Sequence, residues 1–323
     1  MSDTRRRLIA SVLLRRTGQG LGVALAVSVL CFLVVRQLPG DAAYRIAAGR
    51  YGDDLVNAES AAAVRAELGL DRSAWQQLGD WLLDLVQLDF GRSLVSSRPV
   101  LAEVGYYLLG TLQLTAAALG IAIVLGGTIG VVAARRPGGV LDRLTTAWVA
   151  LVRALPPFLL GLLLILLLSV HFGLLPAVGH GNSSSLVLPA LTLAVGISGL
   201  IARVTRDTVI DVTNSEQVQF ARTKGLGERV VLVRHVLRNT GVVLVPYLGA
   251  QAVILIEGVV VVESLFAWQG LGHALVHAVF WRDVPVLQAA ALALARLVVA
   301  INTVVDFAVL GLDPRPRRKG VLA

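Results

Sequence analysis

Long apolar segments alternate with short polar ones along most of the chain. Six of the apolar segments approach or exceed the roughly 20 residues that a helix needs to cross the hydrocarbon core of a bilayer. They predict membrane spans at Thr17–Val35, Tyr106–Ala133, Leu144–His171, Leu186–Ile201, Gly241–Val262 and Val284–Leu310, of which the fourth is the shortest. The pattern therefore predicts an all-α, polytopic membrane protein with six transmembrane helices.

The segment from Arg36 to Gly105 is the longest polar stretch, yet it keeps helical periodicity. Its apolar residues recur at three- and four-residue spacing, as at Val64, Leu68, Trp75, Leu78, Leu82 and Leu85. We expect two or three short helices on the outer face of the membrane, with Trp75 and Trp81 at the interface. A small packed cap without cargo contact fits this pattern as well as a binding role does.

Composition supports the membrane assignment. Hydrophobic residues make up 56% of the chain and charged residues 15%, against about 25% in ordinary soluble domains. The single cysteine, Cys31, excludes an internal disulfide and a cysteine metal cluster. The first apolar segment has the basic start of a signal peptide, but its core is long and no small-residue cleavage site follows it. We therefore expect a retained span.

The basic residues orient the spans. The formal net charge is +8, which in a membrane protein reflects cytoplasmic Lys and Arg, and no nucleic-acid partner is expected. Nineteen of the 29 basic residues fall in the two terminal segments, the second-to-third connection and the fourth-to-fifth connection. All four regions lie on one side of a six-span topology. The bias predicts a multi-pass protein of the cytoplasmic membrane with both termini in the cytoplasm.

Partial matches to catalytic and nucleotide-binding motifs in this sequence each lack a required residue. Neither lysine, Lys224 or Lys319, ends a Gly-Lys-Ser/Thr phosphate loop. His273 and His277 have the i, i+4 spacing of helical metal ligands, but no third ligand follows nearby, so an exposed pair is favoured. We expect no catalytic residue, no metal site and no cofactor bound by this chain.

A few charged residues fall within or near the predicted spans. Charges at such depth usually face a cavity or a partner charge, so cavity-facing positions are predicted for Glu257, Arg296 and Asp306. Arg153 is a fourth such residue. An ion-coupled secondary carrier would arrange charges of this kind into a relay, and four scattered groups support that alternative only weakly.

The polar insert from Gln217 to Asn239 separates two apolar spans and is too charged to lie in lipid. Thr213 and Glu216 have the spacing of a capping box, which predicts a helix from there to about Lys224. Gly225 and Gly227 then break the chain, and a second helix would carry Val230, Val233 and Leu237 on its packed face. Such an insert fits either a protein docking site or an amphipathic helix on anionic lipid.

The insert resembles the coupling loop of ABC importer permeases, whose pattern is Glu-Ala-Ala, three residues, then Gly. Ala221 and Gly225 match it, while Gln219, Phe220 and Arg238 depart from it in the manner of the dipeptide, oligopeptide and nickel permeases. Further segments resemble that subfamily in the right order, namely Leu38–Asp41 (LPGD), Glu67–Asp71 (ELGLD), Asp89–Ser93 (DFGRS), Val262–Gly272 and Leu312–Arg315 (LDPR).

The resemblance implies a type I importer permease that imports a small solute, with di- or oligopeptides as the expected cargo and nickel or a metal chelate as the alternative. It implies a second permease subunit, two ABC ATPase subunits that hold ATP and Mg²⁺, an extracytoplasmic binding protein and surrounding lipid. The ATPase-coupling residues would be Gln219, Phe220, Ala221, Arg222, Lys224, Gly225 and Glu228. The outer mouth would hold Glu263, Phe266, Gly270 and Gly272.

We expect three regions along the chain. Residues 1–105 form the first span and the outer helical loop. Residues 106–310 form the permease core, with the coupling loop at 207–239, and residues 311–323 form a basic cytoplasmic tail.

Overall fold

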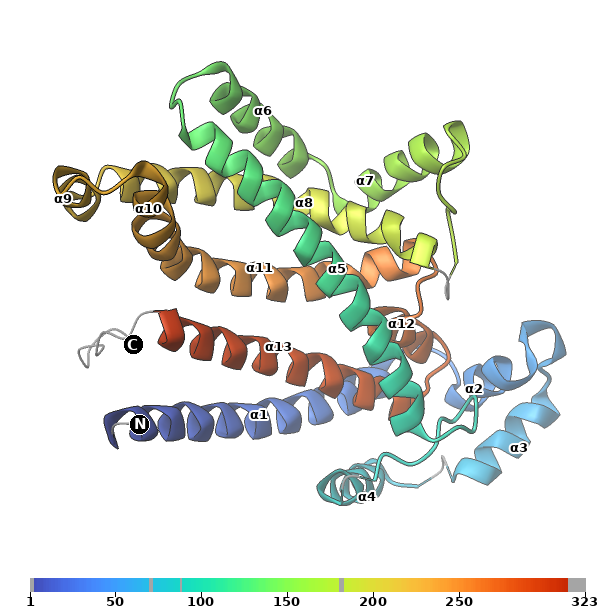
Figure 1. Cartoon of the computed structure of the whole chain (residues 1–323). Coiled ribbons are helices and arrows are strands. Elements are labelled where there is room, and N and C mark those ends of the chain that lie inside the picture. Colours follow the sequence, from blue (N-terminus) through green and yellow to red (C-terminus); the bar gives the residue numbers. More distant parts are fainter. Residues whose placement is uncertain (1–2, 70–71, 88, 180–182, 313–323) are drawn as a thin grey trace. The chain divides into compact units, whose positions relative to one another are not determined.

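The computed structural model describes residues 3–69, 72–87, 89–179 and 183–312 (Figure 1). Within these ranges the regular elements are helices. The α-helices are α1 (Asp3–Gln37), α2 (Ala42–Tyr51), α3 (Ala58–Leu68), α4 (Ala74–Val86), α5 (Val100–Ala134), α6 (Val140–Ala154), α7 (Pro157–Leu164), α8 (Ser183–Thr213), α9 (Glu216–Thr223), α10 (Glu228–Val231), α11 (Arg238–Leu265), α12 (Leu271–Phe280) and α13 (Val284–Leu312). A 3₁₀ turn lies at Asp53–Leu55, and π-helical segments lie at Ile165–His171 and Leu232–Leu237.

Five helical segments are long and apolar enough to cross a membrane, which confirms five of the predicted spans. They are Arg16–Gln37, Val100–Ala134, Ser184–Thr213, Glu228–Leu265 and Val284–Leu312. The prediction that the fourth span is short was wrong, because α8 continues through the charged residues Arg203 and Arg206 to Thr213. These side chains form ion pairs with acidic neighbours, so the helix extends beyond its apolar part.

The predicted third span is broken rather than straight. Its sequence forms α6 and α7, whose axes differ by 104°. The break falls at Pro156 and Pro157, where the chain lacks two backbone N–H donors and the residue before each proline is kept out of the helical region. Leu155 accordingly has extended dihedral angles, and Pro157 begins α7. The single helix expected over Leu144–His171 is therefore corrected to a bent pair.

The described chain forms two compact units. The first unit contains Met1–Leu114, Ala177–Ser185 and Val259–Val299, and the second contains Thr115–Pro176, Leu186–Gly258 and Ala300–Ala323. Four helices, α5, α8, α11 and α13, contribute residues to both units. The division expected from the sequence at residues 105 and 310 follows chain order, and it stays a prediction.

In the first unit, the segment after α1 forms the short helices α2, α3 and α4, which confirms the expected two or three (Figure 1). Helix α2 begins at Asp41, whose carboxylate accepts a hydrogen bond from the Ala43 N–H at 2.9 Å. Arg50 pairs with Glu67 at 2.7 Å across α2 and α3, and this guanidinium lowers the pKa of the Glu67 carboxyl. Trp75 on α4 is exposed, as an interfacial side chain would be.

The core of the first unit joins the end of α1, the start of α5, α12 and the start of α13. Small and β-branched side chains fill it, and the buried members are Val35, Val100, Val104, Leu271, Ala278, Val286, Leu287, Ala289 and Ala290. Because these residues bring α1 and α5 against the consecutive helices α12 and α13, the core positions the α11–α12 connection described below.

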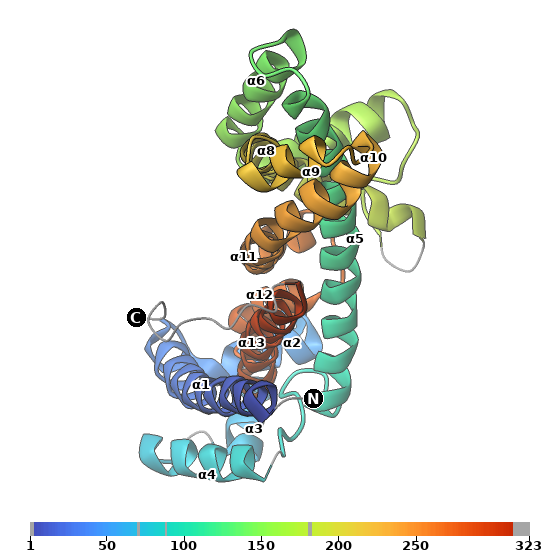
Figure 2. The ribbon, with the colours of Figure 1, turned by 60° about the vertical axis from the view of Figure 1, so that its left-hand side comes forward.

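In the second unit, α5 and α8 approach closely over two glycines spaced four residues apart. A Cβ atom at Gly126 would lie 2.6 Å from the Ser198 carbonyl oxygen, and one at Gly130 would lie 2.5 Å from the Ala202 carbonyl oxygen. This small-xxx-small spacing allows membrane helices to pack backbone against backbone. On the same helix α8, Gly199 packs against Val149 of α6, and Figure 2 shows α6 beside α8.

Candidate functional site

The insert between α8 and α11 begins at a different residue from the expected one. Thr213 ends α8, and Ser215 occupies the N-cap position of α9 with extended dihedral angles. The Ser215 hydroxyl donates to the Val212 carbonyl at 2.6 Å, so it caps no N–H of α9. The capping box predicted for Thr213 and Glu216 is wrong, because Thr213 is the last residue of α8, which continues past Ile201, where the predicted span ends.

One face of α9 is buried against its own unit. Val218 is 0% exposed and Ala221 is also buried, in a cluster with Val209, Val231 and Val236. The residues expected to pack from the second helix, Val230, Val233 and Leu237, are exposed instead.

The difference has a geometric cause. Val231 and Val236 are five residues apart, which is the hydrogen-bond period of a π-helix, and the segment Leu232–Leu237 is π-helical. The α-helical spacing assumed from the sequence therefore assigned the wrong residues to the packed face of the second helix of the insert.

The other face of the insert is open. Phe220 is 61% exposed, and the Lys224 ammonium lies 4.4 Å from the centre of its ring. Gln219 is also exposed. Arg222 forms two hydrogen bonds to Glu228, at 2.9 and 3.2 Å, across the glycine turn. The insert thus presents an aromatic ring and an ion pair on a packed base.

Gly225 makes the turn between α9 and α10. Its φ of +74° lies in the left-handed region that favours glycine, and a Cβ atom there would meet nothing within 4 Å. Backbone conformation, rather than space, therefore selects glycine at this position. The predicted coupling residues from Gln219 to Glu228 are brought together on one turn, and their coupling role stays a prediction.

The predicted mouth residues also come together, but in the interior of the first unit. Glu263, at the end of α11, is 0% exposed. Its carboxylate accepts hydrogen bonds from the Thr111 hydroxyl at 2.6 Å, the Gly272 N–H at 2.7 Å and the His273 N–H at 3.1 Å. The Leu271 N–H donates in turn to the Thr111 oxygen at 2.8 Å. We call Glu263, Thr111 and the 271–273 backbone the Glu263 cluster.

Glycines are required next to the Glu263 carboxylate. A Cβ atom at Gly270 would lie 1.9 Å from Glu263 Oε1, and one at Gly272 would lie 2.5 Å from the Val260 Cα. Phe266 is buried nearby, and the Trp268 indole donates to the Gly110 carbonyl at 3.0 Å. Glu263, Phe266, Gly270 and Gly272 thus fix the α11–α12 connection on α5 within this chain.

Sequence reasoning missed the residues that connect the outer motifs. Arg282, between α12 and α13, donates to the carbonyls of Leu38 and Pro39 at 2.9 and 2.6 Å. Its neighbour Asp283 accepts from the Ser93 hydroxyl, and from the Leu94 N–H at 3.2 Å. The adjacent pair of opposite charges at 282–283 was the available signal. It ties the LPGD and DFGRS motifs to the start of α13.

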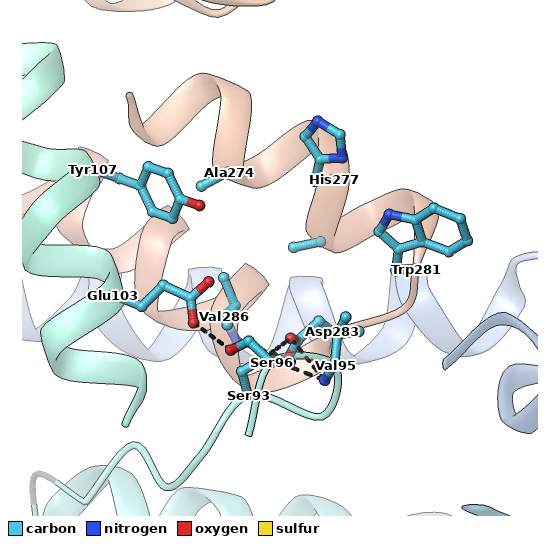
Figure 3. Close-up of a pocket in the computed structure, with 11 residues that line it drawn as sticks. Ser93, Val95, Ser96, Glu103, Tyr107, Ala274, His277, Trp281, Asp283 and Val286 are labelled. Atoms are coloured by element: carbon cyan, nitrogen blue, oxygen red, sulfur yellow. Dashed lines mark hydrogen bonds between the residues drawn. The ribbon is translucent and has the colours of Figure 1, made fainter. Parts of the chain in front are cut away.

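A pocket lies above these contacts in the first unit (Figure 3). Glu103 and Tyr107 line it from α5, and His277 and Trp281 line it from α12 and the residue that follows it. Its volume is about 80 Å³, well below the roughly 300 Å³ at which small-molecule sites begin. The pocket is therefore too small to enclose a peptide.

The charged residues predicted to face a cavity differ in their exposure. Glu257 on α11 and Arg296 on α13 are exposed, and Asp306 is half-buried. Arg296 borders a void of about 10 Å³ beside α1. Their role in a cavity stays a prediction.

The two histidines of α12 contact each other edge to face. The ring centroids of His273 and His277 lie 4.4 Å apart. Burial, with the neighbouring charge of His277, lowers the pKa of His273. Across the described ranges, three or more His, Cys, Asp or Glu side chains nowhere gather in a way that could hold a metal ion.

Comparison with known proteins identifies the class. Residues 126–318 match the family described as binding-protein-dependent transport system inner membrane component. A methionine ABC transporter, MetNI, captured in inward-facing conformations, has the same fold in 67% of this chain and 99% of its own chain, at a TM-score of 0.57 and 20% identity. The fold is that of a type I ABC importer permease.

Closer relatives extend the match over nearly the whole chain. The glutathione transport system permease protein GsiC of Pectobacterium atrosepticum is 38% identical over 295 residues, which cover 91% of this chain and 95% of the relative. GsiC of Escherichia coli K12 is 39% identical over 293 residues, covering 91% and 94%. The chain belongs to the binding-protein-dependent ABC importer permeases, in the dipeptide, oligopeptide and nickel branch.

Family membership settles several expectations. The chain is a multi-pass inner-membrane permease subunit of an ABC importer, and separate ATPase subunits hydrolyse the ATP. ATPase and binding-protein partners follow from the same membership, and the ion-coupled carrier is set aside. The LDPR motif at the C-terminal end lies, apart from Leu312, outside the described residues, as does the basic tail beyond it.

Proposed function

We propose that this permease imports short peptides, delivered by an extracytoplasmic binding protein, together with a second homologous permease subunit and two ATPase subunits. The relatives at 38 and 39% identity are named for glutathione, which is itself a tripeptide. The departures at Gln219, Phe220 and Arg238 from the general coupling pattern support the same branch. The excess of basic residues near the chain ends and beside α9 supports a cytoplasmic position for both termini and for the insert.

The coupling part of the proposal rests on one observation: α9 is buried on one face and carries an exposed Phe220 on the other. An exposed aromatic side chain on a packed base is the kind of anchor that fills a pocket in a partner. The Lys224 ammonium over its ring and the Arg222–Glu228 pair surround it with charge.

In the proposed mechanism, ATP and Mg²⁺ bind to the ATPase subunits and close them on each other. The insert seats Phe220 in an ATPase groove and moves with it. Because Val218 and Ala221 pack α9 against α8, α10 and the π-helical segment that leads into α11, this displacement reaches the membrane helices. The spans then exchange inward-facing and outward-facing states, whose populations the partners shift.

Cargo identity is tested by purifying the complex with its binding protein and identifying the bound solute by mass spectrometry. Short peptides are expected. Uptake by the reconstituted complex is then measured for a dipeptide, for glutathione and for nickel. Import of nickel or its chelate without import of either peptide would replace the proposed cargo.

Coupling is tested by Phe220→Ala in the assembled complex, with Val233→Ala as the matched control. Both residues are exposed apolar side chains of the same insert region. Phe220→Ala is expected to lower transport-coupled ATPase activity by roughly tenfold or more, as truncating an anchor residue does, and Val233→Ala to leave it unchanged. Normal ATPase stimulation and uptake in an assembled Phe220→Ala complex would reject the docking assignment.

A further inference from the structure

A cavity of about 390 Å³ lies in the second unit between α6 and α8. It is several times larger than the pocket of the first unit and falls within the roughly 300–1,000 Å³ range of small-molecule sites. Its polar lining consists of Thr145, Thr146 and Arg153 from α6 and Arg203, Arg206 and Asp207 from α8. Three arginines and one aspartate facing one cavity give it a positive charge.

Arg206 is already occupied. Its Nη2 donates to Asp142 Oδ2 at 2.7 Å and its Nε to the other oxygen of that carboxylate, while its Nη1 donates to Asp207. The Gly138 N–H donates to Asp142 as well, at 2.8 Å. Asp142 and Arg206 therefore neutralise each other and hold α6 on α8.

The other two arginines are only weakly neutralised. Arg203 lies 3.9 Å from Asp207, the carboxylate that Arg206 also uses, and its side chain is 65% exposed. Arg153 is exposed, and no carboxylate among the described residues lies within ion-pair distance of it. Arg153 and Arg203 therefore line the cavity with guanidinium groups that are exposed and open to an anion that enters it.

We propose that this cavity holds the carboxylate of a peptide cargo during its passage, with Arg153 and Arg203 as the binding residues. The inference rests on the proposed function and names the chemical group that this permease recognises. Guanidinium groups bind carboxylates through paired, charge-assisted hydrogen bonds.

The threonines suit the rest of a peptide. The Thr145 and Thr146 hydroxyls donate to the carbonyls of Leu141 and Asp142 at 2.8 and 3.0 Å. Each hydroxyl oxygen therefore keeps lone pairs that can accept an N–H of the cargo. The cavity thus offers an anion site and acceptors on one wall, which matches a molecule with a free carboxylate and N–H groups.

The test compares one dipeptide with its C-terminal amide, each at a concentration that saturates the binding protein, in vesicles holding the complete complex. Arg153→Gln and Arg203→Gln are expected to lower uptake of the free acid by roughly tenfold and to leave uptake of the amide within about twofold. Arg143→Gln is the matched control, because Arg143 is exposed on the same helix α6 and does not line the cavity. Basal ATPase activity and gel filtration verify that each variant assembles.

Three outcomes would overturn the inference. Equal losses for acid and amide would show that the arginines do not read the carboxylate. A loss seen in vesicles containing anionic phospholipid but absent in purely zwitterionic vesicles would assign the cavity to a lipid headgroup. Failure of the unmodified complex to import either peptide would reject the proposed cargo itself, and the inference with it, and this result is distinct from a loss confined to the variants.

Discussion

The Thr111 hydroxyl of α5 donates to the Glu263 carboxylate of α11 at 2.6 Å and, through the same oxygen, accepts from the Leu271 N–H. A buried carboxylate needs several donors to offset its desolvation. Here one hydroxyl and two backbone N–H groups provide them, and α5, α11 and α12 meet at one point.

Thr111→Ala removes a donor from this carboxylate and an acceptor from Leu271. We expect it to lower the free energy of unfolding by about 1–3 kcal/mol, whereas Thr111→Ser keeps the hydroxyl and loses less. Thermal unfolding of the purified subunit in detergent measures the difference. Equal unfolding midpoints for the alanine variant and the unmodified protein would contradict the structural role assigned to Glu263 and its hydrogen bond to Thr111.

Gly270→Ala places a methyl group where the Glu263 carboxylate lies. Because the Cβ would be 1.9 Å from Oε1, the connection must shift, and we expect a loss of at least about 2 kcal/mol. Gly258→Ala is the control on α11, since a Cβ there meets nothing within 4 Å. It should change stability by no more than about 1 kcal/mol. Similar stability for both variants would contradict the packing described here.

Comparing Gly225→Ala with Gly227→Ala tests whether backbone conformation or side-chain volume requires glycine in the insert. Neither Cβ would meet an atom within 4 Å, but φ is +74° at Gly225 and −61° at Gly227. The first change should therefore strain the turn by roughly 1–2 kcal/mol and reduce ATPase coupling, while the second should be tolerated. Stimulated ATPase activity of the assembled complex is the readout, and equal activities would reject the role of the left-handed turn.

Acidification should weaken the α12 region through His273. Burial and His277 lower its pKa, so the unfolded chain takes up a proton first as the pH falls through about 6.5. Above about pH 6.5 the neutral His273 ring gives its full stabilisation. This stabilisation is lost as the pH falls from there to the lower pKa of His273 in the folded protein. His273→Gln should flatten the fall in unfolding midpoint between pH 7.5 and 5.5. The His273 N–H bonded to Glu263 is retained in that variant. An unchanged pH profile would assign the acid sensitivity to other groups.

The sequence located most of the membrane helices because apolar length alone requires them. The break at Pro156 was visible in principle, since two successive prolines disfavour a continuous helix. The extension of α8 to Thr213 was not visible, because it depends on the pairing of Arg206 with Asp142, 64 residues away. A charged residue marks the end of an apolar segment in the sequence. The sequence does not show whether a carboxylate far along the chain pairs with that residue in the fold.

The candidate sites show the same division between local and distant causes. Gly225 follows from a local requirement of the backbone, and the turn lies where it was expected. Glu263 was found by its motif and assigned to the mouth, yet its burial depends on Thr111, which is 152 residues earlier. The buried face formed by Val231 and Val236 depends on π-helical geometry that tertiary packing selects, so no α-helical periodicity could predict it.

The π-helical segment Leu232–Leu237 also sets the angular phase between insert and span. Each residue of an α-helix turns it by about 100°. The extra residue in the wider turn therefore changes the rotation of α9 and α10, which precede it, relative to α11, which follows it. Deleting one residue there would restore an ordinary helix and swing Val231 away from Val209 and Val218. The orientation in which α9 is presented to its surroundings is thus determined by a single surplus residue in the helix that follows it.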